Sequence, residues 1–452
     1  MQEQATSTEN TGKIPSSLTK RSVIGATWIV AGYGASQVLR LASNLVLTRL
    51  LAPEHFGLMA LVNVFMIGLA MFSDVGIGPS IIQSDRSEDK NFLNTAWTVQ
   101  VIRGFVIWFC CIVGAWPFMK FYGDPMLLWL IPVAGLTSVI SGFNATSIFT
   151  TNRNLALGQL TLLEIGSQIA AIALMVSVAL IHPSVWVLVA GSLFAGIVKM
   201  LASHWWLPGI SNRFCWDKTA LHAMVKFGRW IFVSTFLSFF INSAASLILG
   251  KFMNMVDLGL FSIAATLAKV VENLYDQVSN KVLLPVYAHI KHMQAEELRA
   301  RIGKVRRATI AAFLPMLWII VVMGQQLIDL LFDSRYHNAG WMFRIYAAGL
   351  IPVIISGIGP FYLAMGNSLL ALKLETAKFI FYVGAILIGG WLDGATGIIV
   401  ALAAQNLLVY LANIYVQRLY SVWIAWLDAV AILASAAIVW AGFHFNPILH
   451  PL

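Results

Sequence analysis

The segment LTRLLAPEHFGL, from Leu47 to Leu58, recurs 202 residues later as LGKFMNMVDLGL, from Leu249 to Leu260. The same offset holds without a gap over the 47 positions from Trp28 to Asp74, and nine of these positions carry the same residue in both copies. Apolar helices share residues by composition, so the match alone is modest. Each copy, however, opens a run of six hydrophobic segments. A membrane chain made of two repeated halves is typical of transporters in which one half moves against the other.

The composition is that of a membrane protein. Of 452 residues, 59% are hydrophobic and 11% are charged, and the mean hydropathy is +0.79. The apolar runs approach or exceed the roughly 20 residues that cross a bilayer as a helix, and they lack the alternation of a β-barrel. The sequence therefore predicts an all-α integral membrane protein. We expect two repeated six-helix bundles related by an axis along the membrane normal, plus about one additional C-terminal transmembrane helix.

Thirteen spans are expected, with borders good to a few residues. The ninth can begin earlier as a cytoplasmic amphipathic helix, because residues 296–307 are highly charged. The expected ranges are 22–50, 56–82, 91–119, 125–149, 156–181, 184–207, 227–250, 257–285, 308–332, 342–365, 370–391, 395–417 and 424–445.

These spans divide the chain into five parts. A polar tail (1–20) precedes a first bundle (21–208), a cytoplasmic linker (209–226), a second bundle (227–420) and a further helix with its tail (421–452). The apolar run behind the N-terminal tail is too long for a signal peptide, so we expect it to remain as a span.

The distribution of positive charge predicts the orientation. The net charge is +9. In a membrane protein, the excess of Lys and Arg in cytoplasmic loops can explain such a charge without an acidic partner. With a cytoplasmic N-terminus, 20 of the 29 Lys and Arg residues lie on the cytoplasmic side, five lie outside and four lie within spans. We therefore expect a multi-pass protein with its N-terminus in the cytoplasm.

Motifs of catalysis and cofactor binding are absent from the sequence. There is no P-loop, no H-E-x-x-H and no G-x-S-x-G, and the three cysteines show neither a disulfide framework nor metal-ligand spacing. The outer loops are too short for a water-soluble catalytic domain. We therefore expect no enzyme, no cofactor and no metal site.

A polar stripe runs along the first span. Tyr33, Gln37, Arg40 and Asn44 follow at steps of four, three and four residues, and Asn242 occupies the repeat position of Arg40. A charge at the centre of a membrane helix costs about 2.5–3.5 kcal/mol on insertion scales, so Arg40 is expected to face a wet cavity. The uncharged members can equally hold helices together.

The eighth span carries a second polar face. Lys269, Glu272, Asn273 and Asp276 lie within two turns, and Asp74 is the repeat copy of Asp276. The two aspartates can act as a gate or extend toward the inner surface. An internal Lys269–Glu272 ion pair without a transport role is the alternative for that pair.

Further charged residues lie in or beside other spans. Arg103 on the third span can face the cavity or extend to the surface. Glu164 on the fifth can be a proton or cation site, or a buried carboxylate satisfied by hydrogen bonds. Arg49 and its repeat partner Lys251 are expected as anchors at the outer helix ends.

Four stretches resemble a known family. TRLLAPEHFGLMAL (Thr48 to Leu61), DVGIGPSIIQ (Asp74 to Gln83), FYGDP (Phe121 to Pro125) and GATGIIVALAAQN (Gly394 to Asn406) are similar to the Wzx-type polysaccharide flippases. These form the polysaccharide-transport branch of the multidrug/oligosaccharidyl-lipid/polysaccharide exporter superfamily. The resemblance covers about residues 22–420, although family members usually have twelve or fourteen spans rather than thirteen.

The resemblance implies a substrate and a compartment. It implies a polyprenyl-pyrophosphate-linked oligosaccharide, moved by alternating access from the cytoplasmic to the outer leaflet of a bacterial inner membrane for exopolysaccharide, O-antigen lipopolysaccharide or capsule synthesis. The implied partners are this lipid-linked oligosaccharide, membrane lipids, and the polysaccharide polymerase with its chain-length machinery; no nucleic acid is expected.

The same resemblance assigns the polar residues to a headgroup site. Arg40, Lys269 and Arg103 can hold the pyrophosphate, because guanidinium and ammonium groups suit phosphate oxygens. Gln37, Asn44, Asn242 and Asn273 can bond the sugar. Two alternatives remain: a cation-coupled multidrug antiporter of the same fold, which needs a carboxylate-led cavity, and a membrane-embedded polysaccharide-assembly enzyme or subunit.

Overall fold

The computed structural model describes residues 16–73, 77–83, 86, 89–154, 156–222, 247–279, 283, 286–287, 290, 293–357, 361–365 and 367–445. Every element assigned in these residues is helical. The elements are α1 (Ser16–Leu50), α2 (Pro53–Phe72), α3 (Ile77–Gln83), α4 (Lys90–Tyr122), α5 (Leu127–Gly142), α6 (Ser147–Arg153), α7 (Leu157–Ile181), α8 (Trp186–Trp205), α10 (Met255–Val278), α12 (Ala295–Leu331), the short 3₁₀ helix η2 (Ser334–Tyr336), α13 (Ala339–Ser356), α14 (Phe361–Ala364), α15 (Ser368–Leu419) and α16 (Ala425–Phe445).

The fold is that of an all-α multi-pass membrane protein, as predicted. Eight described helices are long and apolar enough to cross a membrane, and a ninth is added if α5 and α6, bent by 60° at their junction, form one span. Twelve of the thirteen expected spans fall on described helices. The seventh, 227–250, lies largely outside the described residues, so the total of thirteen stays a prediction.

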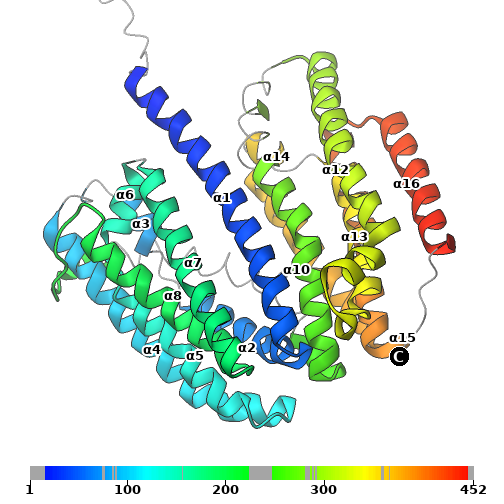
Figure 1. Cartoon of the computed structure of the whole chain (residues 1–452). Helices are drawn as coiled ribbons and strands as arrows, with labels where there is room; N and C mark the ends of the chain where they lie inside the picture. The colour runs from blue at the N-terminus through cyan, green and yellow to red at the C-terminus, as the bar shows by residue number, and fades with distance from the viewer. Residues whose placement is uncertain are drawn as a thin grey trace, which may run out of the picture.

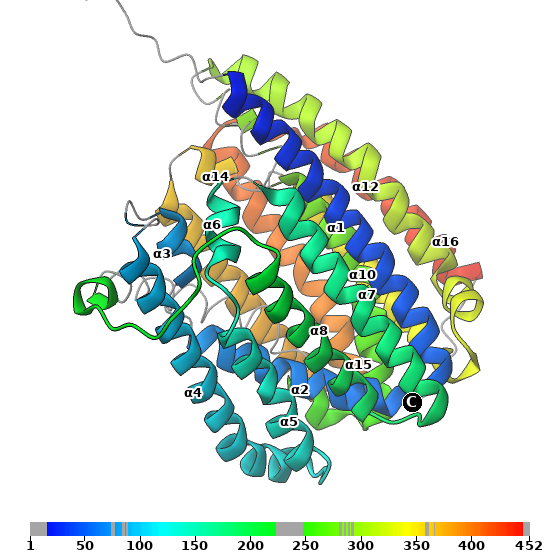
Figure 2. The same cartoon turned by 60° about the vertical axis from the view of Figure 1, so that its left-hand side comes forward.

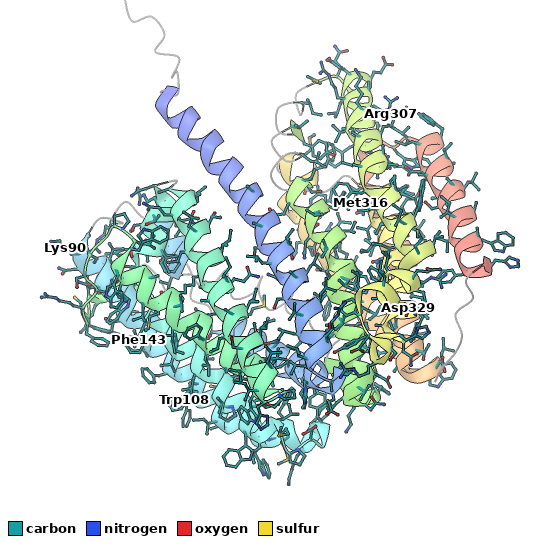
Figure 3. The ribbon with its side chains drawn as sticks, in the orientation of Figure 1. Lys90, Trp108, Phe143, Arg307, Met316 and Asp329 are labelled. Atoms are coloured by element: carbon teal, nitrogen blue, oxygen red, sulfur yellow. The ribbon has the colours of Figure 1, made fainter. Side chains whose placement is uncertain are left out.

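The helices form two groups that meet at one end. Figure 1 shows α3 to α8 on one side and α10 to α16 on the other, with α1 between them. The groups meet where α2 packs along α10 and diverge toward the end at which α1 begins. In Figure 2, α1 and α7 lie side by side. In Figure 3, Lys90 and Arg307 lie toward the diverging end. We call the end at which the groups meet the closed end and the end at which they diverge the open end.

The two groups contact each other through glycines that are repeat partners. A Cβ atom on Gly57 of α2 would overlap the carbonyl oxygen of Met255, and one on Gly259 of α10 would overlap that of Pro53. Pro53 and Met255 are themselves 202 residues apart. Only glycine permits this backbone approach, so the crossing of α2 and α10 depends on both positions.

Two predicted spans appear as one long helix with a reversal. α15 covers the expected ranges 370–391 and 395–417, and its backbone leaves helical geometry at Asp393 and Gly394, where Gly394 has φ of 52°. Cβ atoms on Gly389 and Gly397 would each overlap the other's carbonyl oxygen. Eight residues of straight helix span about 12 Å, so the chain folds back here and α15 is a helical hairpin.

Other boundaries follow local chemistry. In FYGDP, α4 ends at Tyr122, Gly123 takes the left-handed conformation with φ of 77°, and the Asp124 carboxylate accepts the Met126 N–H at 2.8 Å. The second expected span is divided into α2 and α3, and residues 74–76 between them lie outside the described residues. The ninth does begin early: α12 is one helix from Ala295.

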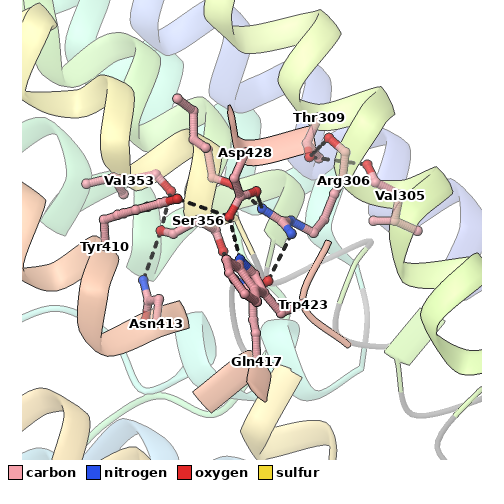
Figure 4. A network of polar contacts seen from close by, with 11 residues as sticks. Val305, Arg306, Thr309, Val353, Ser356, Tyr410, Asn413, Gln417, Trp423 and Asp428 are labelled. Atoms are coloured by element: carbon pink, nitrogen blue, oxygen red, sulfur yellow. Dashed lines mark hydrogen bonds and ion pairs between the residues drawn. The ribbon is translucent and has the colours of Figure 1, made fainter. Parts of the chain in front are cut away.

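A buried ion pair joins the last helix to the second group (Figure 4). Arg306 of α12 and Asp428 of α16 are 0% and 2% exposed and contact each other at 2.5 Å. Arg306 also donates to Gln417 Oε1 at 2.9 Å, while Tyr410 and Trp423 donate to the second oxygen of Asp428. Because both charges are paired and hydrogen-bonded, they fix α16 against α12 and α15.

The segment after α8 lies against α4. Main-chain N–H groups of Arg213, Cys215 and Asp217 donate at 3.0 Å to side chains of α4. Asp217 also contacts the guanidinium of Arg86 at 3.0 Å. The expected linker, in its described part, is therefore fixed to the first group.

Candidate functional site

A cavity of about 560 Å³ lies between the two groups of helices. Its walls come from α1, α2, α7 and α8 of the first group and from α10 of the second. One part of the wall is apolar, with Phe56, Met59 and Phe261 among its members. The cavity therefore lies at the contact between the two groups, so a movement of one group against the other would change its shape.

The polar wall of this cavity carries cations from both halves. Arg40 comes from α1 and Lys269 from α10. Amide and hydroxyl groups accompany them, and no Asp or Glu is among the described residues of the lining. The uncharged polar lining residues are Ser43, Asn44, Asn63, Ser167, Gln168, Ser192, Ser262 and Thr266. Such a set suits an anionic ligand that also carries hydroxyl groups.

One lining side chain is held in place by a helix-to-helix contact. Ser36 Oγ of α1 donates to Gln168 Oε1 of α7 at 2.8 Å, and Gln168 Nε2 donates to the Ser36 carbonyl at 3.3 Å. The amide of Gln168 is thus oriented before a ligand arrives, and one N–H of its amide is not used in this pairing.

The structure brings together three of the predicted headgroup residues. Arg40, Asn44 and Lys269 all line the cavity. Gln37 is buried, with 8% of its surface exposed, and does not line it. Asn242 lies outside the described residues.

Arg103 occupies a different place. Its Nη2 donates to the Ala70 carbonyl at 2.6 Å and its Nε donates to Ser73 Oγ at 3.1 Å. These groups belong to the C-terminal end of α2, where carbonyls lack helical partners. Arg103 therefore caps α2 in this conformation and is not part of the cavity lining.

The predicted face of α10 divides between its two neighbours. Lys269 lines the cavity, whereas Glu272 accepts a hydrogen bond from Tyr346 of α13 at 3.4 Å. Asn273 and Asp276 lie farther along α10 and do not line the cavity. Asp74, the repeat partner of Asp276, lies outside the described residues.

Two further predicted groups have identified contacts. Glu164 of α7 pairs with Lys199 of α8 at 3.5 Å. Lys251 donates to the Phe121 carbonyl at 2.8 Å and lies over the Phe121 ring, and the Arg49 carbonyl accepts from Arg335 at 3.2 Å. Lys251 and Arg49 thus both lie at the closed end of the molecule.

Some relevant residues were missed from the sequence. Asn63 is the one side-chain amide in the apolar segment Pro53–Phe72. An isolated amide in such a segment indicates a residue that faces a polar surface, and Asn63 does line the cavity. Ser192 gave no such signal, because serines in membrane helices also bond their own backbone, as Ser192 does to the Leu188 carbonyl. The pairing of Arg306 with Asp428 joins residues 122 apart and has no local signature.

The fold and the cavity define a class: a helical membrane protein of the transporter type, with a polar site between two halves. The model of the family described as "Polysaccharide biosynthesis protein" matches residues 46–340, and the chain belongs to that family.

Named relatives and a solved structure agree with this membership. The chain is 23% identical over 400 residues to the lipopolysaccharide biosynthesis protein WzxC of Escherichia coli K12, covering 84% of this chain and 78% of that protein. It is 20% identical over 317 residues to the succinoglycan biosynthesis transport protein ExoT of Rhizobium meliloti, covering 69% and 63%. The structure of the lipid II flippase MurJ in an inward closed conformation matches with a TM-score of 0.72 at 13% identity, over 94% of each chain, and shows the same fold.

Proposed function

We propose that this chain is a flippase that moves a polyprenyl-pyrophosphate-linked oligosaccharide from the cytoplasmic to the outer leaflet. The product would supply exopolysaccharide, O-antigen or capsule synthesis. The observation that carries the proposal is the cavity between the halves, where Arg40 and Lys269 approach from opposite sides without a lining carboxylate among the described residues. The relatives WzxC and ExoT, named for lipopolysaccharide biosynthesis and succinoglycan transport, support the same class of substrate.

Arg40 and Lys269 bind the pyrophosphate in this proposal. A guanidinium can hold phosphate oxygens with two parallel hydrogen bonds, and a second cation from the other half neutralises more of the charge. Asn44, Asn63 and Gln168 supply amide donors and acceptors to the sugar. The polyprenyl tail stays in the bilayer, so the cavity does not have to enclose it.

Translocation follows from the geometry of the two ends. The described helices of the two groups, which we assign to bundles 21–208 and 227–420, diverge at the end where α1 begins, so the headgroup enters there. Rocking of the bundles about the α2–α10 contact would close this end and open the other. The headgroup then leaves on the side of Arg49 and Lys251, which we assign as outer anchors.

The orientation and the membrane belong to the same proposal. The positive-inside bias supports a cytoplasmic N-terminus, and with it a cytoplasm-open conformation in a bacterial inner membrane. The polymerase and chain-length machinery would receive the flipped unit in the outer leaflet. No chemical step on the substrate is required, so the chain acts as a transporter rather than an enzyme.

Carboxylates outside the cavity lining are assigned to gating and coupling. Glu272, Asp276 and Glu164 lie on helices that line the cavity, and Glu272 reaches Tyr346 on the second bundle. A cation or proton taken up there would change how α10 packs against α13. Asp74 is proposed for the same role on the basis of the repeat.

The test is leaflet-resolved detection of the lipid-linked oligosaccharide in a deletion strain, with the chain restored as wild type or as Arg40→Ala. We expect the intermediate to accumulate in the cytoplasmic leaflet without the chain and with Arg40→Ala at normal expression. A normal rate of arrival in the outer leaflet of the deletion strain contradicts the proposal. Drug resistance without a change in glycolipid distribution would instead favour the antiporter.

A further inference from the structure

The loop between α12 and α13 reaches from the second half to the end of α1 in the first. Arg335 Nη2 donates at 3.2 Å to the carbonyls of both Thr48 and Arg49, and Tyr336 Oη donates at 3.3 Å to the Leu51 carbonyl. Asp333 holds the Arg335 guanidinium from the other side at 2.5 Å. We name this set, Asp333, Arg335 and Tyr336 on the end of α1, the first latch.

The C-terminal turn of α4 makes a matching contact between the halves. Tyr122 Oη of the first half donates at 2.7 Å to the Leu247 carbonyl, and Lys251 Nζ donates at 2.8 Å to the Phe121 carbonyl. The residues at 247–252 form a described helical turn that precedes α10, as the end of α1 precedes α2. We name the set Phe121, Tyr122, Leu247 and Lys251 the second latch.

The two latches occupy corresponding places in the two halves. One uses the last turn of α4 and the other uses the connection directly after α12, and each contacts the segment directly before α10 or α2 of the other half. Each combines a tyrosine hydroxyl on a main-chain carbonyl with a cation on another carbonyl. The helices that follow these two segments, α2 and α10, contact each other at Gly57 and Gly259.

The chemistry of these contacts suits a joint that opens. The last carbonyls of a helix have no helical partner and carry partial negative charge, so hydroxyl and cationic donors satisfy them well. Thr48, Arg49, Leu51 and Phe121 lie at or just beyond the end of a helix, whereas Leu247 lies inside the helical turn 247–252. Water can replace the donor on each of these main-chain oxygens when the halves separate. Arg335 and Asp333 are already 43% and 33% exposed, so their contacts break at little cost. Tyr336 is fully buried against Phe56 and Phe332, so release of the first latch also separates this apolar contact.

We propose that the two latches are the outer gate, which holds the closed end together in this conformation and must release before the cavity opens on that side. The direction "outer" rests on the proposed function; the gate itself rests on the contacts. Weakening the latches therefore shifts the chain toward a form open at the end of α1 and closed at its beginning.

The experiment measures access to the cavity from each side. A single cysteine replaces Asn63 of the lining in a background with Cys110→Ser, Cys111→Ala and Cys215→Ser, and the purified chain is oriented in proteoliposomes. A membrane-impermeant maleimide is added outside or sealed inside. The variants are Tyr336→Phe, Tyr122→Phe and the double variant, and the matched control is Tyr415→Phe, an exposed tyrosine of α15 outside both latches.

The double variant is expected to react at least fivefold faster with maleimide presented at the closed end and more slowly with maleimide at the open end. Tyr415→Phe should stay within twofold of its parent. A loosened fold would instead raise the reaction from both ends, and that result overturns the proposal, as does an unchanged rate in the double variant.

This readout needs no substrate, so it separates the gate from the flippase. If labelling shifts as expected but the leaflet assay shows no flipping by the wild type, the gate stands and the proposed substrate is wrong. If flipping is observed and labelling does not shift, the latches are packing contacts only.

Discussion

Gly57 of α2 and Gly259 of α10 lie against each other at the point where the two halves meet, although 202 residues separate them in sequence. Each occupies a position where a Cβ atom would overlap a carbonyl oxygen of the other helix, at Met255 for Gly57 and at Pro53 for Gly259. The contact is thus reciprocal between repeat partners. Such reciprocity is what two repeated halves would produce, and the axis that relates them stays a prediction.

A methyl group at this contact should keep the closed end from forming. We expect Gly57→Ala and Gly259→Ala each to reduce flipping at least tenfold, because the obstructing atoms are backbone and cannot rotate away. Gly166→Ala is the matched control, since nothing lies within 4 Å of a Cβ there. Flipping is measured by the leaflet assay, and normal activity of Gly57→Ala would show that the close crossing is dispensable.

The cations of the cavity should affect transport rather than stability. Arg40→Ala and Lys269→Ala are each expected to lower the flipping rate by about 10- to 100-fold, since a hydrogen bond to a charged group is worth about 1.5–3 kcal/mol. Arg40→Lys should retain part of the activity, because it keeps the charge and loses the two-pronged geometry. Lys120→Ala, outside the cavity, is the control. Equal loss in the control would point to expression rather than binding.

The sequence predicted what depends on local composition and periodicity. Helix class, most span borders and the exposure of Arg40, Asn44 and Lys269 to one cavity follow from apolar runs and from the cost of a charge in lipid. The spacing of residues along one helix does not show which neighbouring helix each of its faces contacts. Thus Glu272, three residues from Lys269, turns to Tyr346 rather than to the cavity.

Contacts between distant segments were not predictable in this way. Arg103, like Arg40, carries a guanidinium group within an expected span, yet it caps α2. Arg306 belongs to the highly charged stretch 296–307, yet it is fully buried against Asp428. Both outcomes depend on a partner 30 or more residues away, which a window along one helix does not contain.

The buried pair of Arg306 and Asp428 should dominate the stability of the α16 attachment. Asp428→Ala leaves a fully buried guanidinium without its counter-charge, and removal of one partner of such a pair costs about 3–5 kcal/mol. The double variant Arg306→Met/Asp428→Leu removes both charges and should recover most of the loss. Thermal unfolding in detergent measures both. A double variant as unstable as the single one would show that the other hydrogen bonds of the network, rather than the charge pair, hold α16.

The segment fixed to α4 should respond to acid through Asp217. Hydrogen bonds from Thr219, then from Arg86, lower the pKa of Asp217 to about 2. A carboxyl whose pKa is lowered by folding stabilises the docked segment above its ordinary pKa near 4 and loses that contribution as the pH falls through about 2. Asp217→Asn should loosen the segment already at pH 4.

Pepsin, which is active in this range, can measure the effect. Phe214 and Trp216 are 67% and 54% exposed and become cleavable once the segment leaves α4. The cleavage rate of the folded chain is divided by the rate for the unfolded chain at the same pH, which removes the pH dependence of pepsin itself. For the wild type, this corrected rate should be low at pH 4 and rise toward pH 2. Asp217→Asn should be cleaved rapidly at both. If the wild type is cleaved equally fast at pH 4, the contacts of Arg86 and Thr219 with Asp217 do not hold the segment against α4.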